Sequence, residues 1–169
     1  EGLQSVWVVS GDYKRNADPT CEAFEEVPCD VFISEATFAM PVYHWKEGVE
    51  VVKDLQQWWS SEPNHPSILF CYAFGKAQRV LAELSKLTDR TVYLHGALET
   101  LMPAYRNRNV SFVPNRTVSS VERGYAFAGD LILAPPSAHR SAWMKRFKNP
   151  QTAFASGWMQ IRGARRRRG

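Results

Sequence analysis

The stretch SILFCYAFGKAQRVLAEL, residues 67–84, decides the fold class of this chain. Its first six residues, Ser67 to Tyr72, form a continuous apolar run of strand length. Gly75 and Lys76 then open a segment whose apolar residues share one helical face. These apolar residues are Ala77, Val80, Leu81, Leu84 and Leu87. A buried strand followed by an amphipathic helix is one unit of an α/β fold.

The same alternation extends along the rest of the chain. Strands are predicted at 5–10, 30–34, 91–94, 130–134 and 152–155, and helices at 45–59, 97–105 with a break near Pro103, and 138–147. The polar segment 12–28 between the first two strands is predicted to be a surface loop. Apolar strands alternating with helices favour a mostly parallel sheet covered on both faces, with ligands at the carboxyl ends of the strands.

Composition indicates a folded domain, or one domain with part of another. The chain has 169 residues, of which 44% are hydrophobic and 22% charged. It shows no apolar stretch of the ~20 residues that a membrane helix needs and no signal peptide. The three cysteines lack metal or redox spacing, so a cytoplasmic protein with reduced thiols is expected. Because both ends interrupt sequence patterns, we expect a fragment of a longer chain.

Positive charge is concentrated at the C-terminus. The net charge is +4, but five of the 21 basic residues lie within the last eight positions, which leaves 16 basic against 17 acidic residues in the rest. The cluster consists of Arg162 and Arg165 through Arg168. Two interpretations fit this cluster equally well. It can neutralise nucleic-acid phosphates, or it can be a solvated tail.

Two acidic residues follow predicted strands directly. Asp12 comes after the strand that ends at Ser10 and Gly11, and Glu35 comes after the strand 30–34. A carboxylate at a strand end can bind a metal ion, or it can orient a ligand or water near one. The alternatives are an Asx turn at Asp12 and electrostatic capping of the next segment by Glu35.

Several familiar catalytic motifs are missing. The turn FGKAQ (74–78) lacks the glycines of a Walker phosphate loop, and no G-x-G-x-x-G or G-x-S-x-G motif occurs. The four histidines are widely separated, and His95, at the end of a predicted strand, is the best placed to face a cleft. Trp45, Trp58 and Trp59 are expected in the core beside the first helix.

Four blocks of the sequence, in order, resemble one protein family. They are SGDYKRNADPTCEAFEEVPCDVFISEATFAMP (10–41), FCYAFGKAQRVL (70–81), LAPPSA (133–138) and ASGWMQIRGARRRR (155–168). The chain resembles the β-CASP branch of the metallo-β-lactamase-fold nucleases, and within it the bacterial ligase-associated DNA exonucleases. The resemblance implies an α/β fold with a partial metallo-β-lactamase core at 1–40, a β-CASP domain at 41–159, and a basic segment at 160–169 that returns to the core.

The resemblance also implies roles for individual residues. Asp12 would bridge two zinc ions, with manganese as an alternative, and Glu35 would support the metal site without binding it directly. DNA is the implied substrate, and an ATP-dependent DNA ligase is the implied partner. The residues expected near the nucleic acid are Lys14, Arg15, Lys76, Ser156, Gly157, Trp158, Arg165, Arg166, Arg167 and Arg168.

This sequence departs from the family in two places. The H-x-H-x-D-H motif and the C-terminal histidine motif, which supply the other metal ligands, do not occur in it. Because hydrolysis at a two-metal site needs the full ligand set, we expect this polypeptide to be inactive alone, although the resemblance implies that its parent would be a DNA exonuclease. Two alternatives stay open, namely an RNA-processing nuclease of the same family and a non-catalytic nucleic-acid-binding module.

Overall fold

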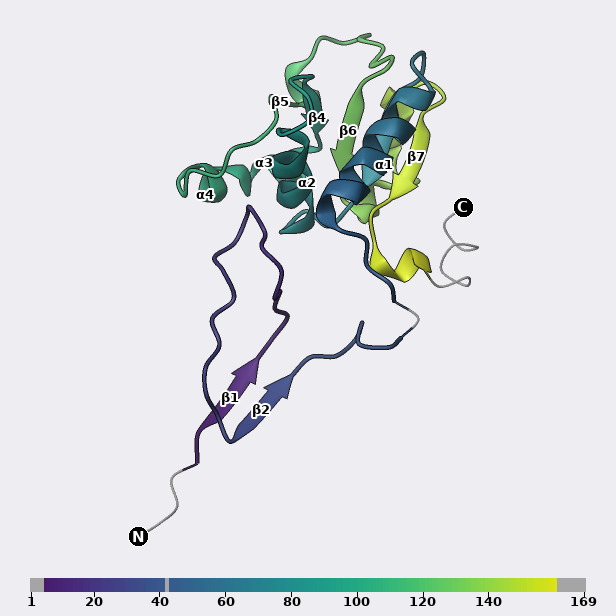
Figure 1. Ribbon diagram of the computed structural model, residues 1–169. Helices are drawn as coiled ribbons and strands as arrows, with labels where there is room; N and C mark the ends of the chain where they lie inside the picture. Colours follow the sequence, from purple (N-terminus) through teal and green to yellow (C-terminus); the bar gives the residue numbers. More distant parts are fainter. Residues whose placement is uncertain (1–4, 42, 161–169) are drawn as a thin grey trace.

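A computed structural model describes residues 5–41 and 43–160 of the chain, which form a five-stranded sheet with its helices and a separate two-stranded sheet (Figure 1). All strand pairs in the large sheet are parallel, in the order β5-β4-β6-β3-β7. Its strands are β3 (Ser67–Phe70), β4 (Val92–Leu94), β5 (Asn115–Thr117), β6 (Leu131–Ala134) and β7 (Gln151–Phe154). The predicted α/β class with a mostly parallel sheet flanked by helices is confirmed.

The helices follow the strands in alternation. They are α1 (Gly48–Ser61), α2 (Lys76–Leu84), α3 (Gly96–Glu99) and α4 (Met102–Arg106). Four short 3-10 helices complete the elements: η1 (Val118–Ser120), η2 (Pro136–Ala138), η3 (Ala142–Arg146) and η4 (Gly157–Gln160). Among the described residues, no helix is both long and apolar enough to cross a lipid bilayer.

Alternating side chains of the central strands build one core on each face of the sheet. Leu69 and Leu133 pack with the buried residues of α1 to α4 on one face. Ile68 and Ile132 pack on the other face, which is covered by Phe127, the 3-10 helices and loops. Both faces are therefore covered, as an all-parallel sheet requires.

Trp59 fixes α1 against the sheet. Its side chain is 1% exposed, and its indole Nε1 donates a hydrogen bond of 2.8 Å to the carbonyl oxygen of Gly129. The Arg90 guanidinium lies 4.0 Å from the ring centroid, on its face. Gly129 has φ of +72°, and a Cβ there would lie 2.7 Å from the Pro63 carbonyl oxygen, so only glycine fits this contact.

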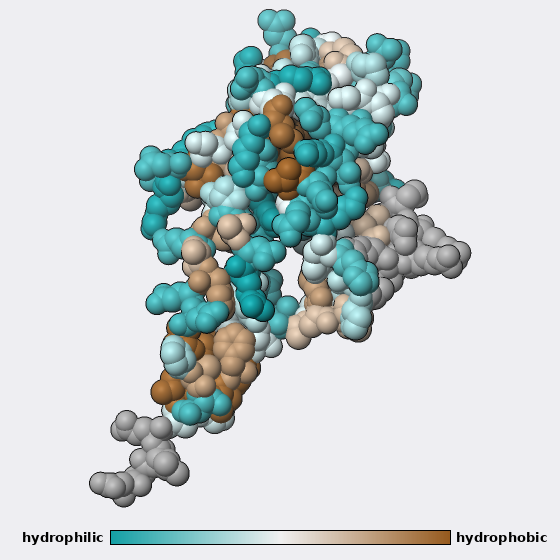
Figure 2. Space-filling view, viewed as in Figure 1, coloured by the Kyte–Doolittle hydropathy of each residue, from teal (hydrophilic) through white to brown (hydrophobic). Residues whose placement is uncertain are grey.

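The two-stranded sheet differs from the large one in burial. It pairs β1 (Trp7–Ser10) with β2 (Val31–Ser34) in parallel, and Ser10 lies opposite Ser34. Trp7 is 61% and Val9 75% exposed, and apolar side chains gather over this projecting part (Figure 2). Whether it belongs to a metallo-β-lactamase core stays a prediction.

Three sequence predictions are corrected. The segment 138–147 forms η2 and η3 instead of an α-helix, because Arg140 has φ of +61° and interrupts it. The first helix begins at Gly48, so Trp45 precedes it and is 57% exposed, whereas Trp59 is buried. Strand β5 was not predicted, since its sequence NRT carries no apolar pattern.

Candidate active site and nucleic-acid interface

Asp12 and Glu35 come together beyond the carboxyl ends of β1 and β2. The parallel register places Ser10 opposite Ser34, so both strands end at the same level and each acidic residue follows its strand end within two residues. The Asp12 side chain is close enough to Glu35 to lower the pKa of the Glu35 carboxyl group. Two neighbouring carboxyl groups can bind one cation between them.

Glu35 is held in a defined orientation. The hydroxyl and the backbone amide of Thr37 both donate hydrogen bonds to its Oε1. These bonds lower the pKa of Glu35, and the nearby Asp12 side chain acts in the same direction. Glu35 therefore makes the local capping contact that sequence reasoning gave as the alternative to a role beside a metal.

The carboxylate pair does not by itself complete a metal site among the described residues. In residues 5–41 and 43–160, no group of three or more histidine, cysteine, aspartate or glutamate side chains is placed to hold a metal ion. Carboxylate oxygens are ligands that zinc and manganese both accept. A tetrahedral zinc site needs four ligands, so the pair fits such a site only together with ligands from elsewhere.

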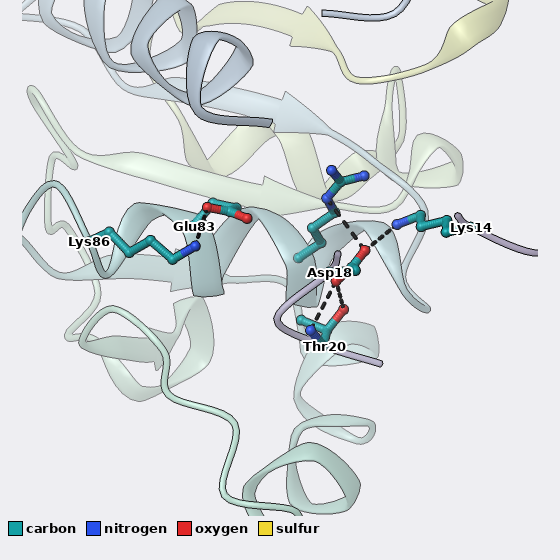
Figure 3. Close-up of polar contacts among 6 residues, drawn as sticks. Lys14, Asp18, Thr20, Glu83 and Lys86 are labelled. Carbon is teal, nitrogen blue, oxygen red and sulfur yellow. Dashed lines mark hydrogen bonds and ion pairs between the residues drawn. The ribbon is translucent and has the colours of Figure 1, made fainter. Parts of the chain in front are cut away.

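The loop between β1 and β2 reaches α2 through Asp18 (Figure 3). The Asp18 side chain is 1% exposed and pairs with Lys14 and with Arg79 of α2, whose Nε lies 3.4 Å from Oδ2. Burial alone would raise the pKa of Asp18, but hydrogen bonds from Lys14 and Thr20 outweigh burial and lower it. The loop between β1 and β2 contains Asp12, and Asp18 anchors this loop to α2.

Lys76 lies close to the same cluster. It is the first residue of α2 and is half-buried. Burial lowers the pKa of Lys76, and the positive charges of Lys14 and Arg79 lower it further. The structure thus brings two of the predicted nucleic-acid contacts, Lys14 and Lys76, to one place.

The other predicted contacts lie elsewhere. Arg15 lines a shallow surface depression with Asn16, Phe24 and Glu26 on the loop. Ser156 lies just before η4, and Gly157 is the first residue of η4. Gly157 packs so tightly that a Cβ at this position would lie 2.5 Å from the Trp45 ring and 3.0 Å from the Phe38 ring. The side chain of Trp158 and the residues Arg165, Arg166, Arg167 and Arg168 lie outside the described part of the structure.

Sequence reasoning missed Asp18 and Arg79. Arg79 follows Lys76 by three residues, so both lie on one side of α2. That spacing could have suggested a pair of cations, but Lys14 and Asp18 lie in a loop, where a separation of four residues predicts no contact. The contact between the loop and the helix, however, joins residues 61 positions apart, from Asp18 to Arg79, and no local pattern indicates it.

His95 acts as a local cap at the carboxyl end of β4. Its Nδ1 accepts a hydrogen bond of 3.1 Å from the amide of Ala97, and its ring packs edge-on against Trp143 at 4.8 Å. Burial lowers the pKa of His95 and raises the pKa of the Cys71 thiol to about 12. At neutral pH both side chains are therefore uncharged, and Cys71 is not an activated nucleophile.

Comparison with known proteins places a similar segment inside a much larger protein. The chain is 26% identical, over 165 residues, to a protein of Opitutus terrae named "Probable DNA ligase". The match covers 96% of this chain and 16% of that protein, so the chain spans a small part of its relative's length. No family model matches the sequence. No solved structure matches it either.

Proposed function

We propose that this chain is part of a metal-dependent DNA nuclease, a phosphodiester hydrolase that acts in repair together with DNA ligation. The placement of Asp12 and Glu35 just beyond the ends of two adjacent parallel strands carries the proposal. Neither residue is needed to hold the five-stranded sheet together, because both belong to the exposed β1–β2 part. Their convergence beyond two strand ends fits a chemical role.

In this proposal Asp12 binds metal directly, and Glu35, oriented by Thr37, fixes the position of the Asp12 side chain. A bound metal pair would supply an activated water and neutralise charge on the scissile phosphate. Since the described residues offer only these two carboxylates at this position, the remaining ligands would come from the longer protein.

The link to ligation rests on the relative. A segment similar to almost all of this chain lies within a protein whose name is that of a DNA ligase. The proposed nuclease would prepare DNA ends for such an enzyme. The basic run Arg165–Arg168 would hold the DNA backbone, which its charge favours.

The test uses the longer protein that contains this segment, with Asp12→Asn and Glu35→Gln variants. Zinc and manganese content are measured by elemental analysis, and end-labelled DNA is assayed for cleavage. Asp12→Asn should abolish cleavage and remove bound metal, whereas Glu35→Gln should lower both partially. Glu25→Gln, an exposed carboxylate on the same loop, is the matched control and should change neither.

The same assay separates the alternatives. An RNA-processing nuclease would cleave RNA in preference to DNA of the same sequence, because the 2′-hydroxyl is the group that distinguishes them. A non-catalytic module would bind DNA with salt-dependent affinity and need no metal. Cleavage that survives Asp12→Asn with unchanged metal content would refute the proposed role of the carboxylate pair.

A further inference from the structure

An aromatic side chain is exposed at the turn between β3 and α2. Phe74 is 72% and Tyr72 54% exposed, although β3 itself is completely buried. Gly75, with φ of +77°, forms the tight turn, and the Lys76 amide donates a hydrogen bond of 3.0 Å to the Phe74 carbonyl oxygen. The turn therefore holds the backbone of Phe74 in place while its ring faces solvent.

The Phe74 ring is supported from one side. Its centroid lies 6.4 Å from that of Tyr105, and Tyr105 lies 6.2 Å from Phe112, which packs against the helix-side core. A chain of ring contacts thus connects the exposed Phe74 ring to the core on one side and leaves the rest of the ring open to solvent.

Positive charge surrounds the same turn. Lys76 directly follows Gly75, and both Lys14 and Arg79 are close enough to act on its charge. Asp18 is the carboxylate that pairs with Lys14 and Arg79, so one negative charge is shared by two of these three positive charges. In the described part of the chain no carboxylate forms an ion pair with Lys76. A half-buried lysine without such a partner, in a cationic surrounding, favours an anionic ligand.

We propose that Phe74, supported by Tyr105, is a base-stacking platform for single-stranded nucleic acid, whose phosphates are held by Lys14, Lys76 and Arg79. Proteins bind single strands by combining aromatic faces with a cationic groove. The bases inside a duplex are already stacked on one another, so only unpaired bases or a terminal base pair can stack on Phe74. The choice of nucleic acid as the ligand rests on the proposed function, and the preference for a single strand goes beyond it.

The test measures binding of a fluorescein-labelled 20-nucleotide oligothymidylate and of a duplex of equal length, in EDTA so that nothing is cleaved. Phe74→Ala should weaken binding of the single strand about 5- to 100-fold, the effect of losing one stacked base. Phe74→Trp should restore the affinity, because it keeps an aromatic face. Duplex binding should change much less than single-strand binding among the three proteins, because only the terminal base pairs of a duplex expose a free face.

Controls separate stacking and charge from damage to the fold. Tyr125→Ala removes an aromatic side chain that is 44% exposed and lies near the amino end of β6. Phe74 follows the carboxyl end of β3, at the other end of the parallel strands, so this substitution should not change binding. Lys76→Gln should reduce the salt dependence of single-strand binding by about one phosphate contact. Lys53→Gln, on the exposed side of α1, should not. Thermal unfolding of each variant shows that it is folded.

Three results would overturn the proposal. These are failure of the wild-type chain to bind the single strand, equal loss of single-strand and duplex binding in Phe74→Ala, and tighter binding of an acidic peptide than of DNA at the same site. Because binding is measured without metal, the result does not depend on cleavage. Loss of cleavage in Asp12→Asn together with unchanged single-strand binding would support both proposals. Each proposal can also fail without the other, because cleavage and binding are measured separately.

Discussion

The two sheets of this protein are both parallel, yet they are stabilised very differently. In the large sheet, β3 and β6 are completely buried between two cores. In the small sheet no residue of β1 or β2 is buried, and apolar side chains such as Trp7 and Val9 face solvent. Parallel pairing alone therefore does not make a sheet stable. Stability requires that other elements cover both faces of the sheet.

The comparison shows where chemistry and stability reside. The candidate carboxylate pair lies just beyond the strands of the weakly packed sheet, whereas Phe74, Lys76 and Arg79 of the proposed platform follow a strand of the strongly packed one. The loop that carries Lys14 and Asp18 connects them. A functional element placed on a weakly stabilised part depends on such anchors for its position.

Amide hydrogen exchange should show the largest contrast. We expect the hydrogen-bonded amides of β3 and β6 to exchange at least about 1,000-fold more slowly than those of β1 and β2, because exchange from the large sheet requires opening of a buried core. The measurement is residue-resolved exchange by NMR at neutral pH. Equal protection of both sheets would mean that they unfold as one cooperative unit.

A pair of tryptophan substitutions tests the same contrast by stability. Trp59→Ala should lower the free energy of unfolding by about 3–5 kcal/mol, because it removes a buried ring and its bond to Gly129. Trp7→Ala, at a residue 61% exposed, should change it by no more than about 0.5 kcal/mol. Urea denaturation followed by circular dichroism measures both. A similar loss for the two variants would contradict the contrast.

Two glycines give a smaller effect of the same kind. Gly129→Ala should destabilise the chain by about 2 kcal/mol, since a positive φ and the Pro63 carbonyl oxygen both oppose a Cβ there. Gly11→Ala, where a Cβ meets nothing within 4 Å, should change stability by less than about 0.5 kcal/mol. Thermal denaturation of the two variants is the measurement, and unaltered stability of Gly129→Ala would count against the packing described for Trp59.

The smallest expected effect concerns the anchor itself. The pKa of Asp18 is lowered in the folded protein, so its contribution to stability is present above the ordinary aspartate pKa of about 4 and is lost as pH falls through the lowered value. Protection of the Thr20 amide, which donates to Asp18, should fall over that range relative to the intrinsic exchange rate at each pH. In Asp18→Asn this pH dependence should be missing, and its persistence would show that another group holds the loop.

The buried strands and their order of appearance were predictable, because continuous apolar runs such as Ser67–Phe70 carry their own signal. The convergence of Asp12 and Glu35 was also predictable, since parallel strands end at the same edge. β5 was not, because an edge strand of three polar residues is defined by its partner β4 and not by its own sequence.

Other contacts depended on distant parts of the chain. The first helix begins at Gly48, after Trp45, and the Trp45 ring packs with Phe38, Tyr43 and Gly157 instead. The platform at Phe74 was equally hidden, because its supporting rings come from Tyr105 and Phe112. Sequence periodicity reports which residues are apolar, but not which distant residues cover them.

Strand β5 also affects how the protein behaves at high concentration. A short polar strand at the rim of a sheet offers few unpaired backbone groups and a poor apolar surface to another molecule. Aggregation by strand addition is therefore disfavoured at this edge of the large sheet. The β1–β2 pair, with exposed apolar side chains and open edges, is where self-association of the isolated chain is expected to begin.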